Sequence, residues 1–215
     1  MTRPLIRIMI ADSFDVVRRG VRLLVETHDY CRVVGEACNG RDALTMARDT
    51  RPNIAIVDYS LPELNGLDLA YEIRKASPAT EVLIFTSHNR EEIVVSVLRS
   101  GVRGFVLKSD PDDSLMAAVD SLSVNRPYFS RTVSDLLLER FLQTKADEFE
   151  GSLTHRERQV VQLIAEGKIN KQIGHILDIS VKTVETHRAS AMHKLNLRTT
   201  ADLVRYAIRN NLAQP

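Results

Sequence analysis

The sequence predicts a doubly wound α/β domain with a five-stranded parallel sheet, followed by an all-α domain of four helices. In roughly the first 124 residues, short β-branched runs alternate with longer amphipathic stretches, which is typical of parallel strands joined by crossover helices. From residue 151 onward only short helical patterns occur. The charge also changes sign there, because ten Lys or Arg face five Asp or Glu after residue 150, whereas acids outnumber bases before it.

We therefore expect one domain at 1–124, a helical connector and linker at 125–150, and a second domain at 151–215. The chain has 215 residues, which suits two domains of modest size. Its apolar fraction of 44% and charged fraction of 27% are typical of globular proteins and disfavour disordered, collagen-like and rod-like classes.

The same composition argues against membrane and secreted classes. The longest apolar runs are far shorter than the ~20 residues that a membrane-spanning helix needs, and charges interrupt the N-terminal segment. Cys31 and Cys38 are the only cysteines, and on one strand they would point to opposite faces. We expect a cytoplasmic protein without a disulfide framework or a cysteine metal cluster.

Each strand and helix of the first domain follows from local pattern. Three runs, IRIMIA, NIAIVD and EVLIFT, are almost entirely apolar, which indicates strands buried on both faces of a sheet. The expected strands are 5–11, 32–37, 54–58, 81–86 and 104–108, and the expected helices are 14–27, 40–49, 65–76, 90–100 and 112–123. Residues 124–151 show no strand pattern, and apolar residues at helical spacing over 133–141 predict a connecting helix.

Helix start and stop residues define the second domain. Thr154 and Glu157 have the spacing of a capping box, and Gly167 is expected to end the helix that they begin. Further helices are expected at 170–177, 181–195 and 200–209, the first two of these joined by a three-residue turn. Two short helices at a tight turn, in a basic part of the chain, predict a helix-turn-helix that binds DNA.

Polar residues fall at the carboxyl ends of four predicted strands, where functional groups of open parallel sheets collect. They are Asp12, Asp58, Thr86 and Lys108. A carboxylate, a hydroxyl and an ammonium at one edge could form and hold an aspartyl phosphate, with Asp58 attacking and with Thr86 and Lys108 binding phosphoryl oxygens. A divalent cation between Asp12, Asp58 and the phosphoryl group would offset their shared charge.

These motifs resemble those of a known family. Residues 5–123 resemble the receiver domain of two-component response regulators in Ile10-Ala11-Asp12, Val57-Asp58-Tyr59-Ser60-Leu61-Pro62, Phe85-Thr86 and Gly104-Phe105-Val106-Leu107-Lys108. Residues 153–210 are similar to the LuxR/NarL/FixJ helix-turn-helix in Leu153-Thr154-His155-Arg156-Glu157, Asn170-Lys171-Gln172-Ile173 and Lys182-Thr183-Val184-Glu185-Thr186-His187-Arg188. The resemblance implies a bacterial transcription regulator whose receiver takes a phosphoryl group from a histidine kinase.

The resemblance also implies roles for single residues. Asp58 would be the phosphoacceptor and Lys108 the phosphate-binding lysine, while Thr86 and Phe105 would form the switch pair. The metal site would be made by Asp12, Asp58 and the carbonyl of Ser60. Dimerisation on DNA is implied as well, through either the fourth helix of the second domain or the face of the fifth strand.

The sequence departs from the family pattern at one metal position. Receivers of this kind usually have two adjacent acidic residues after the first strand. Here Asp12 occupies the first of these positions and Ser13 the second, and Phe14 follows. Because Mg²⁺ prefers charged oxygen ligands, Ser13 is expected to weaken its binding. The receiver is then controlled by phosphorylation at Asp58 or works partly or wholly without it.

The third helix of the second domain separates into two faces. Val184, Ala191 and Leu195 recur on the face that points to the small core. The opposite face is expected to enter the major groove of DNA. The expected DNA-binding residues are Lys171, Lys182, Thr183, Glu185, Thr186, Arg188 and Ala189, of which Arg188 lies at the rim between the faces and could equally pack on the core.

Two other classes of function compete with a DNA-binding regulator. One is a protein-interaction adaptor that uses the receiver-like domain to bind other regulators. The other is a phosphotransfer enzyme with Asp58 as nucleophile, which is disfavoured because the sequence offers no second acid or base and no substrate-binding insertion near the strand ends.

Overall fold

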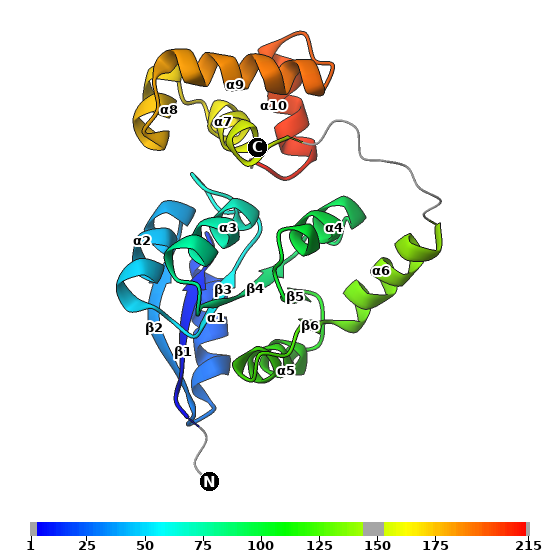
Figure 1. Ribbon diagram of the computed structural model, residues 1–215. Coiled ribbons are helices and arrows are strands. Elements are labelled where there is room, and N and C mark those ends of the chain that lie inside the picture. The colour runs from blue at the N-terminus through cyan, green and yellow to red at the C-terminus, as the bar shows by residue number, and fades with distance from the viewer. Residues whose placement is uncertain (1–3, 144–152, 214–215) are drawn as a thin grey trace. The chain divides into compact units, whose positions relative to one another are not determined.

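The computed structural model describes residues 4–143 and 153–213. They fall into two compact units, which are considered one at a time: the first contains β1 to α6 and the second α7 to α10 (Figure 1).

The first unit is a parallel sheet with helices on both faces. Its strands run in the order β2-β1-β3-β4-β5-β6, so the strand order reverses at β1. The strands are β1 (Ile6–Ala11), β2 (Cys31–Ala37), β3 (Ile54–Val57), β4 (Glu81–Thr86), β5 (Gly104–Leu107) and β6 (Tyr128–Phe129). The helices are α1 (Asp15–Glu26), α2 (Gly40–Thr50), α3 (Gly66–Ala76), α4 (Glu91–Arg99), α5 (Asp112–Ser123) and α6 (Arg131–Gln143).

Five of the strands were expected, and the prediction that no strand follows residue 124 is wrong. Tyr128–Phe129 forms β6, which pairs in parallel with β5. The amide of Tyr128 donates to the carbonyl of Arg103, and the amide of Ser130 donates to that of Phe105. Two residues are too few to show an alternating apolar pattern, so the sequence could not predict this strand. Tyr128 and Phe129 form a strand because they pair with the edge of β5.

The apolar strands place the core on both faces of the sheet. Helices α1 and α5 cover one face, where Val21 and Val25 of α1 and Val119 and Leu122 of α5 pack against inward residues of the strands. Helices α2 and α3 pack against each other, with α2 against β1 and β2 and α3 against β4. Helix α6 packs against α4 and β5, and its Val133 is fully buried. This burial on both faces explains the nearly unbroken apolar runs.

The second unit is a small bundle of four helices: α7 (His155–Ala165), α8 (Asn170–Leu177), α9 (Val181–Lys194) and α10 (Thr200–Arg209). Thr154 and Glu157 form the expected capping box at the start of α7. Gly167 has φ +80°, and the amides of Gly167 and Lys168 donate to the carbonyls of Ile164 and Leu163, which closes the helix. The core includes Val160, Ile173, Val184 and Leu203, all fully buried.

Among the residues that the structure describes, no helix is both long enough and apolar enough to span a membrane.

Candidate functional site

Strand register brings the acidic residues of the first unit together. Ala11 of β1 lies opposite Val57 of β3, so Asp12 and Asp58 follow side by side at the point where strand order reverses. The two residues are 3% and 5% exposed, respectively. Gly66 at the start of α3 packs against this turn, and a Cβ there would lie 2.3 Å from the Asp58 carbonyl oxygen. Glycine at this position therefore allows α3 to approach the Asp58 backbone.

One ammonium group lies between the two carboxylates. Lys108 follows β5, and its Nζ lies 2.5 Å from Asp12 Oδ2 and 3.3 Å from Asp58 Oδ1. Its side chain is only 15% exposed, so these ion pairs are weakly screened by solvent. The structure therefore brings together three of the predicted residues, with Thr86 fully buried at the end of the neighbouring β4.

The Asp12 carboxylate is also held by the backbone, because its Oδ1 accepts the amide of Phe14 at 2.8 Å. Burial raises the pKa of the Asp12 carboxyl above its ordinary value, while the hydrogen bonds from Lys108 and Phe14 act in the opposite direction. Lys108 and the Phe14 amide thus offset part of the effect of burial on this carboxyl.

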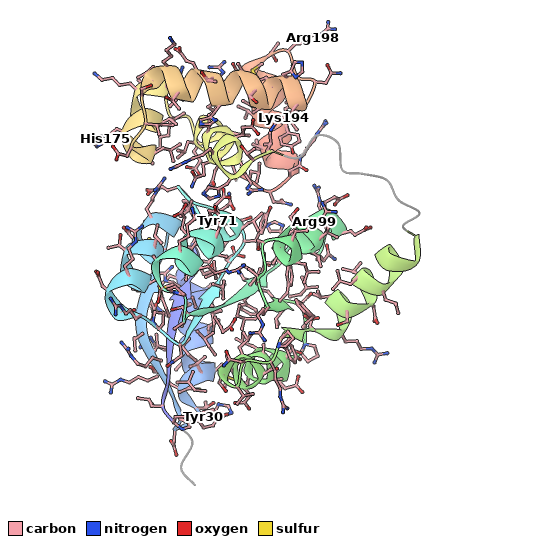
Figure 2. All side chains as sticks on the ribbon, in the orientation of Figure 1. Tyr30, Tyr71, Arg99, His175, Lys194 and Arg198 are labelled. Carbon is pink, nitrogen blue, oxygen red and sulfur yellow. The ribbon has the colours of Figure 1, made fainter. Side chains whose placement is uncertain are left out.

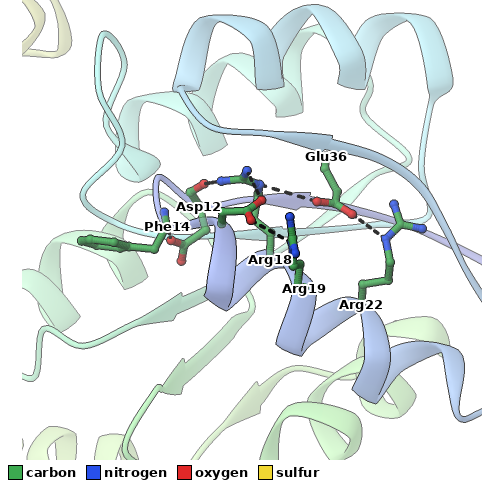
Figure 3. Close-up of polar contacts among 7 residues, drawn as sticks. Asp12, Phe14, Arg18, Arg19, Arg22 and Glu36 are labelled. Atoms are coloured by element: carbon green, nitrogen blue, oxygen red, sulfur yellow. Dashed lines mark hydrogen bonds and ion pairs between the residues drawn. The ribbon is translucent and has the colours of Figure 1, made fainter.

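An arginine that sequence reasoning missed braces the turn between β1 and α1. Arg18 donates to the Asp12 carbonyl oxygen at 2.8 Å and to Asp15 at 2.9 Å, and it lies 3.5 Å from Glu36, which also pairs with Arg22 (Figure 3). The three-residue spacing of Asp15 and Arg18 on one helix is a sequence signal that could have predicted their ion pair. The result is a rigid turn that carries Ser13.

Two oxygens near this turn have unused hydrogen-bonding capacity. Ser13 Oγ and Asp58 Oδ1 are buried and accept or donate no hydrogen bond among the described residues, although Asp58 Oδ1 has the ion pair with Lys108 at 3.3 Å. With the Asp12 carboxylate and the Ser60 carbonyl, they form a set of hard oxygen donors that fits Mg²⁺, although only two members are charged. The residues present are therefore compatible with the metal that the family resemblance implies.

His88 is a second residue near these carboxylates that no sequence motif predicted. Its Nε2 lies 2.7 Å from Ser60 Oγ, and its amide donates to Thr86 Oγ1 at 3.4 Å. Burial lowers the pKa of the His88 imidazole, against the opposing effect of Asp58. Phe105, the other predicted switch residue, is fully buried in β5.

In the second unit, α9 presents one polar face to solvent. Val184 and Ala191 are fully buried, which places the opposite side of the helix at the surface. The exposed residues of that side are Lys182, Glu185, Thr186, Ala189 and His193. Ser180 caps the helix by accepting the amide of Thr183, and Thr186 donates its hydroxyl to the Lys182 carbonyl, so that its methyl group is the part left for contact.

The remaining basic candidates lie at the side of α9. Arg188 donates to Thr200 Oγ1 at the start of α10 instead of pointing along the polar face. It lines an open hollow of about 500 Å³ together with Lys168, from the turn before α8, and Lys171, from the first turn of α8. A group of three cations beside the polar face favours contact with an anion such as a DNA phosphate.

A buried carboxylate joins α7 to α9. Glu157 lies 2.8 Å from Lys194 Nζ and 2.5 Å from Ser190 Oγ, and it accepts the Thr154 amide at 2.7 Å. Burial alone would raise the pKa of Glu157, but these hydrogen bonds lower it to about 2. Figure 2 labels Lys194 near the C-terminal end of α9, ahead of the turn that contains Arg198. The contact fixes α9 against the rest of the unit.

Comparison with protein families assigns both units. A family model described as the response regulator receiver domain matches residues 8–120. A second, described as bacterial regulatory proteins of the luxR family, matches residues 151–207. Together they include the acidic strand ends and the helices of the second unit as far as residue 207, within α10.

Full-length relatives agree with this assignment. The oxygen regulatory protein NreC of Staphylococcus epidermidis is 35% identical over 97% of this chain and 99% of its own. The transcriptional regulatory protein MctR of Rhizobium johnstonii is 32% identical over 98% and 96%. Among solved structures, RcsB of Salmonella typhimurium matches with a TM-score of 0.68 and 27% identity over 95% and 97% of the two chains. An RcsB–DNA complex matches with a TM-score of 0.60 and 26% identity over 94% and 97%.

Proposed function

The chain belongs to the response regulators that join a receiver domain to a LuxR-type helix-turn-helix, and on this premise we propose that Asp58 accepts a phosphoryl group that controls DNA binding by α9. The observation that carries the proposal is the Lys108 ammonium held between Asp12 and Asp58. A cognate histidine kinase is the proposed phosphoryl donor, because a receiver implies one.

The reaction follows from these positions. A carboxylate oxygen of Asp58 attacks phosphorus, a new P–O bond forms, and the bond from phosphorus to the donor breaks, so the electron pair leaves with the donor. Lys108 then moves from Asp12 toward the phosphoryl oxygens and balances their charge. The Thr86 hydroxyl donates a hydrogen bond to the same group.

Mg²⁺ would be held by Asp12, Asp58, the Ser60 carbonyl and the Ser13 hydroxyl, directly or through water, and would neutralise charge on the transferring group. We propose that affinity for the metal is reduced because Ser13 supplies no charge. Asp12 then contributes more to holding the metal, and Lys108 more to balancing the charge of the phosphoryl group, than in a site with three acidic residues.

Intact-mass measurement after incubation with acetyl phosphate and Mg²⁺ tests this proposal. We expect the wild-type protein to gain the mass of one phosphoryl group, which fragmentation assigns to Asp58. We also expect Ser13→Asp to bind Mg²⁺ roughly tenfold more tightly, equal to about 1.4 kcal/mol, because it adds a charged ligand. Metal titration of both proteins measures this difference, and Ser13→Ala serves as a control that adds no charge.

Two outcomes would count against these expectations. Equal Mg²⁺ affinity in wild type and Ser13→Asp would show that Ser13 does not limit the metal site. An unchanged mass in both proteins at saturating Mg²⁺, with DNA binding intact, would show that the receiver acts without phosphorylation.

For DNA recognition we propose that the exposed face of α9 enters the major groove as part of a homodimer. Lys182 contacts phosphate or guanine, Glu185 accepts from cytosine N4, and the Thr186 methyl contacts thymine. Lys171 and the neighbouring backbone amides hold a phosphate at the start of α8. Because one such unit buries little surface, two copies on adjacent half-sites are needed for specific binding.

The groove assignment predicts different losses for different residues. Lys182→Ala is expected to weaken binding about tenfold and, if it contacts phosphate, to reduce the salt dependence by about one counterion. Thr186→Ala should instead relax the preference for one base pair, at a cost of ~1 kcal/mol. Titrations on a sequence selected from random DNA, at several salt concentrations, measure both.

Lys75→Ala in α3 is the charge-matched control. Equal losses for Lys75→Ala and Lys182→Ala would contradict the assignment, and wild-type binding without salt dependence would favour an adaptor.

A further inference from the structure

A single carboxylate connects the end of β5 to the start of α6. Asp110 Oδ2 accepts the amide of Leu107 at 2.8 Å, and the Asp110 amide donates to the Leu107 carbonyl at 3.0 Å. The other carboxylate oxygen, Oδ1, accepts the hydroxyl of Thr132 at 2.8 Å. Asp110 thus closes a tight turn after the strand and, with the same side chain, holds the first turn of α6.

The turn from Leu107 to Asp110 contains the lysine that contacts the two carboxylates at the strand ends. Lys108 is two residues before Asp110, its ammonium contacts Asp12 and Asp58, and its amide donates to the Thr86 carbonyl at 2.8 Å. A displacement of the Lys108 side chain therefore acts on a very short, doubly hydrogen-bonded loop. Lys108 and Asp110 lie in the same four-residue turn, so a change in the Lys108 backbone is only two residues away from the Asp110 carboxylate.

The other end of the connection is anchored in the fold. Just before α6, the Ser130 amide donates to the carbonyl of Phe105, the fully buried switch residue. Val133 is fully buried where α6 packs against α4 and β5. The start of α6 is consequently held by two different contacts, one to the strand and one to the loop. Among the described residues, α6 is the last element of the first unit before the DNA-binding domain.

We propose that the hydrogen bond between Thr132 and Asp110 is a latch that couples phosphorylation of Asp58 to the seating of α6. This inference rests on the proposed function. When Lys108 leaves Asp12 for the phosphoryl group, the turn from Leu107 to Asp110 shifts and the latch opens. The backbone hydrogen bonds in the first turns of α6 then open more often, so the helix that precedes the DNA-binding domain is less ordered.

Hydrogen exchange in the full-length protein tests the latch, with acetyl phosphate and Mg²⁺ as the probe. We expect phosphorylation of wild type to raise exchange of the amides of residues 134–137 about threefold, in keeping with the loss of one exposed hydrogen bond. Thr132→Val removes the hydroxyl but keeps the branched shape. It should show the raised exchange before phosphorylation and no further rise after it, whereas Thr132→Ser should behave like wild type.

The intact mass of each sample separates the possible failures. If the proteins gain the phosphoryl mass but Thr132→Val and wild type show the same exchange in both states, the latch is overturned and the proposed function stands. If no protein gains mass, the proposed function fails and the coupling fails with it. A rise confined to wild type and Thr132→Ser supports the latch.

Discussion

Asp58→Asn is expected to abolish phosphoryl transfer completely. The amide lacks the negatively charged, nucleophilic oxygen that attacks phosphorus. Of the two carboxylates that Lys108 contacts in the described structure, only Asp12 then remains. The variant should show no mass gain with acetyl phosphate and Mg²⁺. Its affinity for DNA should be the same with and without the donor.

The matched control is Asp49→Asn, which removes one exposed carboxylate from α2, away from the strand ends. It should gain mass and respond on DNA as wild type does. A phosphoryl group found on the Asp58→Asn protein would place the acceptor elsewhere and contradict the assignment. A DNA response that persists without phosphorylation would separate DNA control from Asp58.

The second large effect is expected at Glu157, in the DNA-binding domain. Its side chain is 4% exposed and pairs with Lys194, which is 34% exposed. Glu157→Gln keeps the shape but loses the charge, so the unfolding free energy of this domain should fall by about 2–3 kcal/mol. The value is below that for fully buried pairs because Lys194 can turn toward water. Hydrogen exchange of the α9 amides in the full-length protein measures the loss.

The same residue predicts how stability changes with pH. Because the folded domain holds the pKa of Glu157 at about 2, below its ordinary value of 4.5, the ionised form stabilises the folded state. This contribution, on the order of 3 kcal/mol, is complete above pH ~5.5 and is lost as the pH falls toward 2. Glu157→Gln should remove this part of the pH dependence.

Glu185→Gln is the control for both measurements, since it neutralises an exposed acid on the same helix. We expect it to change the unfolding free energy by less than ~0.5 kcal/mol. If the two variants had equal effects, net charge rather than the buried contact would be responsible.

Much of the fold could be predicted because local pattern and burial agree. The buried strands read as apolar runs, the α7 capping box lies in four consecutive residues, and α5 and α10 have close to the expected bounds. Asp12, Asp58 and Lys108 could be placed together because parallel strands end at one edge of the sheet.

The remaining features depend on tertiary contacts between distant residues. β6 exists because β5 leaves an edge to pair with, and Arg18 reaches Glu36 on a strand that follows a whole helix. His88 meets Ser60 across 28 positions of sequence. No periodicity marks such contacts, because each depends on how two elements distant in sequence are placed by the finished fold.

The shared position of Lys108 has a consequence for the background activity of the switch. The ammonium is hydrogen-bonded to Asp12 and lies 3.3 Å from Asp58, so on the proposed function an arriving phosphoryl group must compete with Asp12 for it. That competition adds to the barrier for transfer from any donor, because the pair between Lys108 and Asp12 must separate before the ammonium can bind the phosphoryl oxygens. On the proposed function, we therefore expect transfer from a small free donor such as acetyl phosphate to go to completion but more slowly than transfer from a donor protein held at the site.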